Sequence, residues 1–190
     1  MIAICTPTRD DVHALFAQSL INLQRRSPDV RWLVSFGTIL PNLRSELVMG
    51  AFNISASHVL FIDSDMVFPP DTVQRLLSHD LDIVAANCIQ RQRLRWTARK
   101  DQREVESLDR VGLEEVTTVG FGVTLIKTSV FNKLQVPWFD TPWDGARHMG
   151  EDIYFCQLAN HGGYKIFIDH DLSQEVGHVG TKQFTVNDME

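Results

Sequence analysis

Residues 58–71 read HVLFIDSDMVFPPD, and this stretch decides the fold class that we expect. The apolar run from Val59 to Ile62 has the length of a buried strand, and two aspartates one residue apart, Asp63 and Asp65, end it. Paired carboxylates at such a place can hold one hard cation, Mg²⁺ or Mn²⁺, together with phosphate oxygens of a substrate. A polar turn without chemistry uses the same residue type, because aspartate is common in turns. Both interpretations are open from this stretch alone.

Strand and helix patterns alternate around this stretch. Short apolar runs bounded by glycine, proline or polar residues are typical of buried strands, and apolar residues at intervals of three and four are typical of amphipathic helices. The expected strands cover residues 2–6, 30–36, 58–62 and 81–86, and the expected helices run from Asp10 or Asp11 to Arg26, from Asn42 to Ile54 and from Pro69 to Leu77. This order predicts an α/β fold with a mostly parallel central sheet and helices on both faces.

The ends of the predicted strands indicate where a ligand should bind. In open α/β sheets, ligands lie beyond the carboxyl ends of the strands. Two segments of this chain come to that edge, Thr6-Pro7-Thr8-Arg9 after the first strand and Asp63-Ser64-Asp65 after the third. We therefore expect them to lie near each other although they are far apart in the sequence.

Composition excludes some classes of protein. The net charge of −6 argues against a dedicated nucleic-acid-binding domain, because such domains are usually basic. Cys5, Cys88 and Cys156 are odd in number and widely spaced, which favours reduced, buried thiols in a cytoplasmic protein over a disulfide framework. No apolar run has the length that a transmembrane helix needs. We expect a cytoplasmic protein that binds no nucleic acid.

Six motifs resemble those of glycosyltransferases with the GT-A fold, in particular family-2-like enzymes. In chain order they are ICTPTRD, LPNLRSELV, the D-x-D segment LFIDSDMVFPPD, VGFGVTLIKTSVF, the "ED" segment GEDIYFC, and HVG. The resemblance implies a Rossmann-like sheet with a small antiparallel element on the acceptor side. It also implies a single domain over residues 1–190, with a nucleotide-binding half at 1–87 and an acceptor-side, catalytic half at 88–190.

The resemblance implies a metal-dependent transfer of a sugar from a UDP- or GDP-linked donor to a hydroxyl group of a glycan, protein or lipid-linked acceptor. Mn²⁺ or Mg²⁺ would be the cofactor, held by Asp65 and His178 with Asp63 beside them. Asp63 would also bind the ribose. The other residues implied in nucleotide binding are Thr6, Pro7, Thr8, Arg9, Arg44 and Ser64.

The same resemblance implies the catalytic residues. Asp152 would be the general base of an inverting reaction, and Glu151 would support the acceptor or the helix. The segment GEDIYFCQLANHGG predicts a helix from about Glu151 that Gly162-Gly163 ends. An aspartate at a helix N-terminus should stay ionised and ready to accept a proton. One departure concerns the nucleobase. Many relatives carry an acidic residue after the second strand that reads uracil, whereas this chain has SFGTIL there, so the base stays open.

Several further residues have two interpretations each. Gly120 and Gly122, on either side of Phe121, indicate a close approach of the backbone to a sugar or a simple bulge. Trp143 is either a platform for a sugar ring or part of a packing cluster. His148 either contacts phosphate or acceptor or belongs to a polar loop. The basic stretch at 91–110 either grips an anionic ligand or is a solvated surface.

Three rival functions share parts of this pattern. DSDMV fits the motif of haloacid-dehalogenase-type phosphatases, with Asp63 as nucleophile and Asp65 as acid and base, but that motif normally follows the first core strand. A nucleotidyltransferase should carry a glycine-rich loop after the first strand, which TPTRDD lacks. A non-catalytic domain that binds sugar nucleotides is the third. Because the chain is short for the fold, another subunit is one source of acceptor recognition, and an oligomer is compatible with the sequence.

Overall fold

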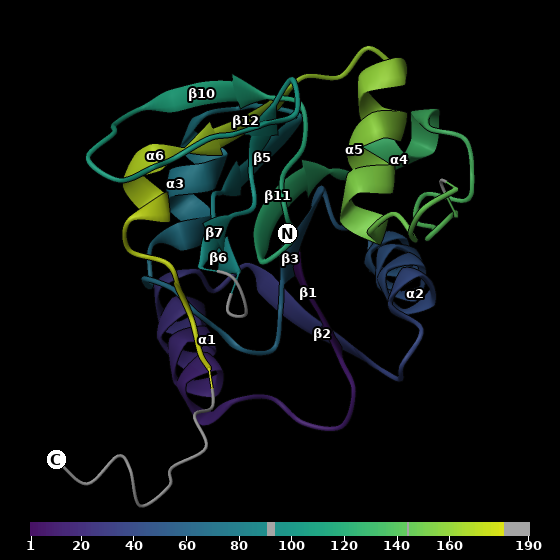
Figure 1. Cartoon of the computed structure of the whole chain (residues 1–190). Coiled ribbons are helices and arrows are strands. Elements are labelled where there is room, and N and C mark those ends of the chain that lie inside the picture. Colours follow the sequence, from purple (N-terminus) through teal and green to yellow (C-terminus); the bar gives the residue numbers. More distant parts are fainter. Residues whose placement is uncertain (91–93, 144, 181–190) are drawn as a thin grey trace, which may run out of the picture.

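The computed structural model describes residues 1–90, 94–143 and 145–180. Strands and helices alternate in the first half, and shorter elements fill the second (Figure 1). The strands are β1 (Ile2–Thr8), β2 (Val30–Phe36), β3 (His58–Ile62), β4 (Met66–Val67), β5 (Ile83–Ala86), β6 (Ile89–Gln90), β7 (Arg95–Trp96), β8 (Arg99–Lys100), β9 (Arg103–Glu104), β10 (Leu113–Val116), β11 (Val123–Lys127), β12 (Ile166–Asp169) and β13 (Gly177–His178). The helices are α1 (Ala14–Arg26), α2 (Leu40–Asn53), α3 (Thr72–Ser78), α4 (Thr128–Lys133), α5 (Glu151–His161) and α6 (His170–Ser173).

Within the described residues, one seven-stranded sheet forms the centre of the molecule, in the order β10-β12-β5-β11-β3-β1-β2. β1 pairs in parallel with β2 and β3, and β12 pairs in parallel with β5. β11 runs antiparallel between β3 and β5, and β10 runs antiparallel to β12. The mostly parallel sheet is therefore confirmed, with a reversed strand inserted at its centre.

Helices cover both faces of this sheet, as the alternating pattern predicts (Figure 1). On one face α1, α3 and α6 contribute buried apolar residues to one core cluster. On the other, α2, α4 and α5 contribute to a second cluster that holds most of the buried phenylalanines. Successive side chains of a strand point to opposite faces, and β3 follows this rule: Val59 and Phe61 join the second cluster, while Leu60 and Ile62 join the first. This double burial explains the continuous apolar run.

Some boundaries differ from the sequence prediction. α1 begins at Ala14 and is capped by His13, whose Nδ1 accepts a hydrogen bond from the Leu15 backbone, so neither Asp10 nor Asp11 is the cap. α2 begins at Leu40, ahead of the predicted Asn42, because Pro41 fits the first turn of a helix. α5 begins at Glu151 and ends at His161, before Gly162, as predicted.

The small antiparallel element consists of two-residue pairs and the edge strand β10. β6 pairs with β7, β8 pairs with β9, and β13 pairs with β4. All three cysteines are buried free thiols, as expected. Among the described residues, none of the helices is long and apolar enough to cross a membrane.

Candidate functional site

The segments after β1 and β3 lie side by side, as their places at the carboxyl ends of parallel strands predict. The backbone N–H of His13 donates to the carbonyl of Ser64 at 2.9 Å, and Gly37 N–H, after β2, donates to the Thr8 carbonyl at 3.0 Å. The Thr8 hydroxyl donates to the Asp11 carbonyl and fixes the turn after β1. These bonds build one rim from the ends of three neighbouring strands.

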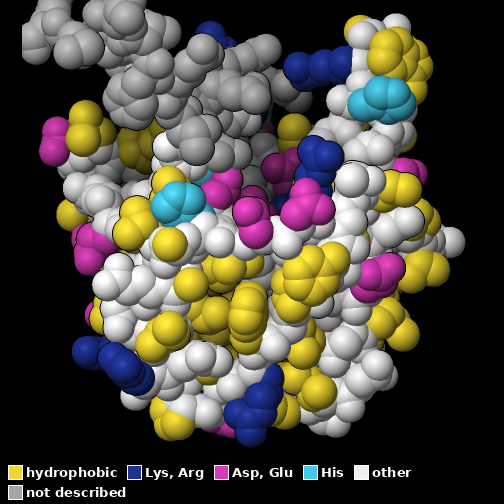
Figure 2. Space-filling view, turned by 90° about the horizontal axis from the view of Figure 1, so that it is seen from below, with side chains coloured by type: hydrophobic (Ala, Val, Ile, Leu, Met, Phe, Trp, Pro, Cys, Tyr) yellow, Lys and Arg dark blue, Asp and Glu magenta, His cyan; other side chains and the backbone are white. Residues whose placement is uncertain are grey.

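A cleft of about 470 Å³ opens at this rim. Figure 2 shows acidic side chains gathered beside a hollow on this side of the molecule. The residues that line the cleft are Pro7, Thr8, Arg9, Gly37, Thr38, Leu40, Leu43, Asp63, Ser64, Asp65 and His178. Seven of the predicted nucleotide and metal residues therefore share one cavity, although they come from three distant parts of the chain.

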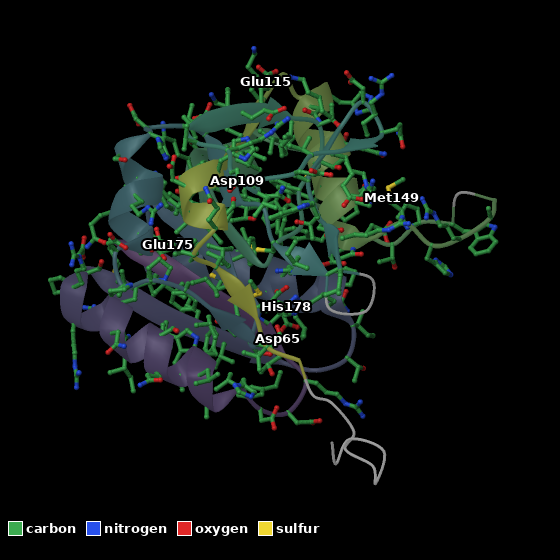
Figure 3. All side chains as sticks on the ribbon, turned by 60° about the vertical axis from the view of Figure 1, so that its left-hand side comes forward. Asp65, Asp109, Glu115, Met149, Glu175 and His178 are labelled. Carbon is green, nitrogen blue, oxygen red and sulfur yellow. The ribbon has the colours of Figure 1, made fainter. Side chains whose placement is uncertain are left out.

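Asp65 and His178 face each other in this cleft (Figure 3). The Nε2 of His178 lies 3.1 Å from Oδ1 of Asp65. Two features bring them together: β13 pairs with β4, with His178 opposite Met66, and the Val179 N–H donates to the Asp65 carbonyl at 2.8 Å. The short C-terminal strand thus places a distant histidine next to the D-x-D segment.

This pair has the donor atoms and the supporting bond of a metal site. The Nδ1 of His178 lies 2.9 Å from the carbonyl oxygen of Ile89, so Nδ1 must carry the proton, because a carbonyl only accepts. Metal-binding histidines commonly make this bond, which turns the lone pair of Nε2 to the ion. In the neutral imidazole that lone pair faces a carboxylate oxygen, which is unfavourable unless a proton or a cation lies between them.

The donor atoms of Asp65 and His178 fit a cation whose coordination a substrate completes. Among the described residues there is no cluster of three or more His, Cys, Asp or Glu side chains placed to hold a metal ion. Mg²⁺ and Mn²⁺ sites that bind phosphates commonly use only one or two carboxylates from the protein, and an imidazole ligand favours Mn²⁺ over Mg²⁺. Asp65 and His178 meet this requirement, with Asp63 in the same cleft.

Arg44 is buried and does not line the cleft, and the nucleotide contact that the resemblance implies stays a prediction. Its side chain is only 2% exposed, and its Cζ lies 5.2 Å from the ring centre of Phe61 and 5.3 Å from that of Phe121. Nε donates to Glu151 Oε1 at 3.0 Å, and Nη2 donates to Asp63 Oδ1 at 3.1 Å. Arg44 therefore joins the end of β3 to the start of α5.

The charges in this group influence one another. Burial by itself lowers the pKa of Arg44, but the ion pairs with Asp63 and Glu151 outweigh it, so the pKa of Arg44 is raised. Burial raises the pKa of Asp63, and the Arg44 guanidinium only partly offsets this. Several carboxylates surround one guanidinium, which leaves an excess of negative charge on this side of the molecule. Such an excess favours the binding of a cation.

Glu151 and Asp152 occupy the first turn of α5, where acidic side chains complement the helix dipole. Glu151 is buried, and its Oε1 accepts a hydrogen bond from Arg44 Nε, which ties the start of α5 to Arg44. Asp152 is half-buried, and its Oδ1 accepts a hydrogen bond from the Ile153 N–H at 2.7 Å. Burial, together with the Glu151 charge, raises the pKa of Asp152 to about 6. Asp152 is therefore more basic than the dipole alone predicts, yet mostly ionised at neutral pH.

The structure separates other predicted residues from the cleft. The hydroxyl of Thr6 is buried and accepts a hydrogen bond from Trp32 Nε1 at 3.0 Å. Phe121 is buried among the phenylalanines of the core. A Cβ at Gly120 would lie 2.9 Å from Thr97, and one at Gly122 would lie 2.9 Å from Cys88 Sγ. The space that these glycines leave is filled by neighbouring side chains.

Trp143 and His148 lie on the loop before α5, which projects from the body of the protein beyond Met149 (Figure 3). Their backbones form an isolated β-bridge, and their rings meet edge to face with centres 5.2 Å apart. The ring of Trp143 is 60% exposed. Because this side chain is exposed, both interpretations of Trp143 as a platform or a packing residue stay open. Trp138 and Phe139, by contrast, are buried in the core.

Sequence reasoning missed the wall of the cleft formed by Gly37, Thr38, Leu40 and Leu43. A signal for it was present, because SFGTIL follows the second strand at the same edge of the sheet. The described lining residues of this wall are uncharged.

A second pocket, of about 580 Å³, lies beside the β8–β9 hairpin and β10. It is lined by residues of both signs, and Arg110 pairs with Glu114 across 2.5 Å. This pattern favours a solvated charged surface for the described part of the 91–110 stretch; Arg91 and Arg93 lie outside the described residues. None of the predicted site residues lines this pocket.

Comparisons with known proteins bear on the family and the fold. The Anp1 family model, which describes a glycosyltransferase family, matches residues 38–106, the segment that carries Arg44 and the D-x-D aspartates. No curated protein sequence matches the chain. Among solved structures, A197 from STIV is similar with a TM-score of 0.65 and 16% identity over 98% of both chains.

TarS from S. aureus is similar too. Its 1–349 fragment gives a TM-score of 0.54 at 12% identity, over 94% of this chain and 60% of that one, and the TarS chain gives 0.56 at 13%, over 94% and 36%. The chain therefore spans well under two thirds of TarS, and at these identities the likeness shows the fold. The fold is therefore that of GT-A glycosyltransferases, and over residues 38–106 the sequence is similar to a glycosyltransferase family.

Proposed function

We propose that this protein is a metal-dependent glycosyltransferase, which moves a sugar from a UDP- or GDP-linked donor to an acceptor hydroxyl with inversion at the anomeric carbon. The observation that carries the proposal is the junction of two sites by Arg44. This residue ties Asp63, which lines the cleft with Asp65 and His178, to Glu151, which adjoins Asp152. A donor site and a candidate base thus share one rigid support.

Asp65 and His178, with Asp63 beside them, would hold Mn²⁺ or Mg²⁺. A divalent cation there supplies Lewis-acid stabilisation of the negative charge on a departing diphosphate. The residues of the chain would orient the nucleotide and exclude water from the cleft. The Thr8–Asp11 turn and the bond from His13 to Ser64 fix the rim, and the uncharged wall at Thr38, Leu40 and Leu43 offers an apolar surface to the nucleoside.

Asp152 would accept the proton of the acceptor hydroxyl as its oxygen attacks. A general base works best when its pKa lies near the working pH, and a pKa of about 6 leaves Asp152 ionised at pH 7 while raising its basicity. The loop with Trp143 and His148 leads directly into α5, so it would carry the acceptor. Glycan, protein and lipid-linked acceptors all suit an exposed loop of this kind.

The rival functions have less support. A phosphatase of the haloacid-dehalogenase type needs Asp63 as a free nucleophile, whereas Asp63 Oδ1 is bound by Arg44 Nη2. A nucleotidyltransferase lacks its glycine-rich loop here. A domain that only binds sugar nucleotides would not need a basic aspartate beside the Arg44–Glu151 pair.

A thermal-shift screen tests the proposal. UDP, GDP, UDP-glucose, UDP-N-acetylglucosamine and GDP-mannose are added with and without Mn²⁺. A ligand at about 100 times its Kd stabilises the native state by ~2.7 kcal/mol, which corresponds to a rise of roughly 5 to 11 °C for a domain of this size. We expect this rise for at least one nucleotide and only with the metal. A nucleotide response that is equal without metal would reject metal dependence, and release of phosphate from phosphomonoesters would favour the phosphatase.

A further inference from the structure

Gly150 stands directly before the two acidic residues of α5, and the carboxylate of Asp152 lies close to it. A Cβ built on Gly150 would lie 2.6 Å from Asp152 Oδ1 and 3.7 Å from Asp152 Cγ. Non-bonded carbon and oxygen atoms do not approach so closely. The carboxylate of Asp152 therefore occupies the space that a side chain at position 150 would take.

The backbone does not explain this glycine. Gly150 is the N-cap of α5 with φ −67° and ψ 146°, an extended conformation that any residue adopts. Its carbonyl accepts the N–H of Tyr154 at 3.0 Å, and every residue could offer that carbonyl. What a side chain at 150 would meet is the carboxylate of Asp152, the end of a flexible side chain.

In the space beside Gly150, the carboxylate of Asp152 is surrounded by groups that change its pKa. There, Oδ1 accepts the Ile153 N–H, Glu151 raises the pKa of the carboxyl group, and Arg44 from α2 lowers it. Asp63, at the end of β3, also raises the pKa. A methyl group at position 150 would turn the carboxylate away, because the end of a flexible side chain moves more easily than the start of a helix.

We infer that Gly150 is a positioning residue for Asp152, which it holds folded back over the start of α5 by leaving the space for its carboxylate. This inference rests on the proposed function, in which Asp152 is the base. Displacement of a reacting group by about 1 Å can reduce a rate by ~10²-fold. Binding of the nucleotide should not change, since Gly150 does not line the cleft.

The first measurement needs no substrate. The amide signal of Ile153 in ¹H–¹⁵N spectra reports its hydrogen bond to Asp152. We expect Gly150→Ala and Gly150→Ser to move this signal towards its place in Asp152→Ala. Gly50→Ala is the matched control, because its new Cβ would lie 3.2 Å from the end of the Leu33 side chain, outside the site. An Ile153 signal that stays unchanged in both Gly150 variants would overturn the inference.

The second measurement is turnover of the sugar nucleotide that stabilises the protein in the thermal screen, followed by release of nucleoside diphosphate. We expect Gly150→Ala and Gly150→Ser to lower kcat by about 10- to 100-fold with an unchanged Kd for the nucleoside diphosphate. Serine is a strong N-cap, so a loss with Gly150→Ser separates positioning from helix capping. Gly50→Ala should keep the wild-type kcat. Wild-type turnover in both Gly150 variants would reject the inference.

A double variant separates the inference from the proposed function. In the Asp152→Asn background, Gly150→Ala should cause no further loss beyond about twofold, because residues that act as one unit are not additive. An equal loss in both backgrounds would show that Gly150 acts through another group. Full turnover in Asp152→Asn alone would reject the base, and with it the proposed function, while the spectra would still report on the packing.

Discussion

At the scale of single residues, Asp63 and Asp65 are not equivalent. Asp63 is held from below by Arg44, whereas Asp65 turns to His178 in the cleft. The D-x-D motif does not distinguish the two positions, because both are aspartates. Both line the same cavity, and the expectation that Asp65 is the metal ligand stays a prediction.

Replacement of Asp65 tests this difference. We expect Asp65→Ala to abolish the Mn²⁺-dependent part of nucleoside diphosphate binding, because it removes the carboxylate opposite His178. Isothermal titration with UDP and GDP, with and without Mn²⁺, measures the effect. Asp71→Ala, outside the cleft, is the control and should bind as the wild type does. Equal metal-dependent binding by Asp65→Ala would refute the assignment.

Replacement of Asp152 tests the base. We expect Asp152→Asn to keep the Kd of the nucleoside diphosphate and to lower kcat by about 10²- to 10⁴-fold, the usual contribution of a general base. The wild-type kcat should fall as the pH drops below 6, because Asp152, with a pKa of about 6, becomes protonated. A profile of kcat from pH 5 to 8 checks this. A flat profile together with an active Asp152→Asn would leave Asp152 without a catalytic role.

At the scale of elements, α2 and α5 are joined to β3 through the buried guanidinium group of Arg44. Arg44 is near the start of α2, Glu151 begins α5, and Asp63 follows β3. Breaking such a buried pair by removal of one partner costs more than the pair contributes, because the remaining charge stays uncompensated. Arg44 therefore supports these three elements, and its contact with the nucleotide stays a prediction.

Arg44→Met should lower the free energy of unfolding by about 3–5 kcal/mol, measured by urea denaturation in the absence of ligands. Arg75→Met is the matched control: Arg75 pairs with Glu175 at 2.6 Å at the surface, and its loss should cost about 1 kcal/mol or less. Adding Glu151→Gln to Arg44→Met should recover part of the loss. A loss for Arg44→Met no larger than the control would contradict the buried role.

At the scale of the whole molecule, the charge of one candidate site residue, Asp152, lowers the stability of the fold. Ionisation of the half-buried Asp152 opposes folding, since its pKa in the folded protein, about 6, exceeds its ordinary value of 3.8. The protonated carboxyl group therefore contributes to the free energy of unfolding. This contribution is complete below pH 3.8 and is lost as the pH rises through 6.

Asp152→Asn removes the ionisation and should therefore be more stable than the wild type at pH 7. We expect a gain on the order of 1–2 kcal/mol, reduced by solvent near the half-buried carboxylate, that disappears near pH 4. Thermal melts of both proteins from pH 4 to 7 without metal or nucleotide measure it. A difference that is constant over this range would mean that the pKa of Asp152 is not raised.

The same physics explains what the sequence could predict. The strands and helices were predicted well because apolar periodicity is local: β2 and β3 have the predicted bounds, and α5 begins at the acidic pair and ends before Gly162. The cap of α1 was misplaced because several polar residues before a helix can each cap it. The two-residue strands were missed because so short a pairing leaves no periodic signal.

By itself, the sequence determined the alternation of strands and helices, the place of Asp63 and Asp65 at a strand end, and the position of Asp152 at a helix start, since each is a property of neighbouring residues. Only the tertiary structure decided that β11 enters the sheet reversed, that Arg44 is enclosed by Phe61 and Phe121, and that β13 brings His178 to Asp65. These features depend on packing between segments far apart in the chain. Their energies come from burial and charge pairing in the folded state, which sequence spacing does not reveal.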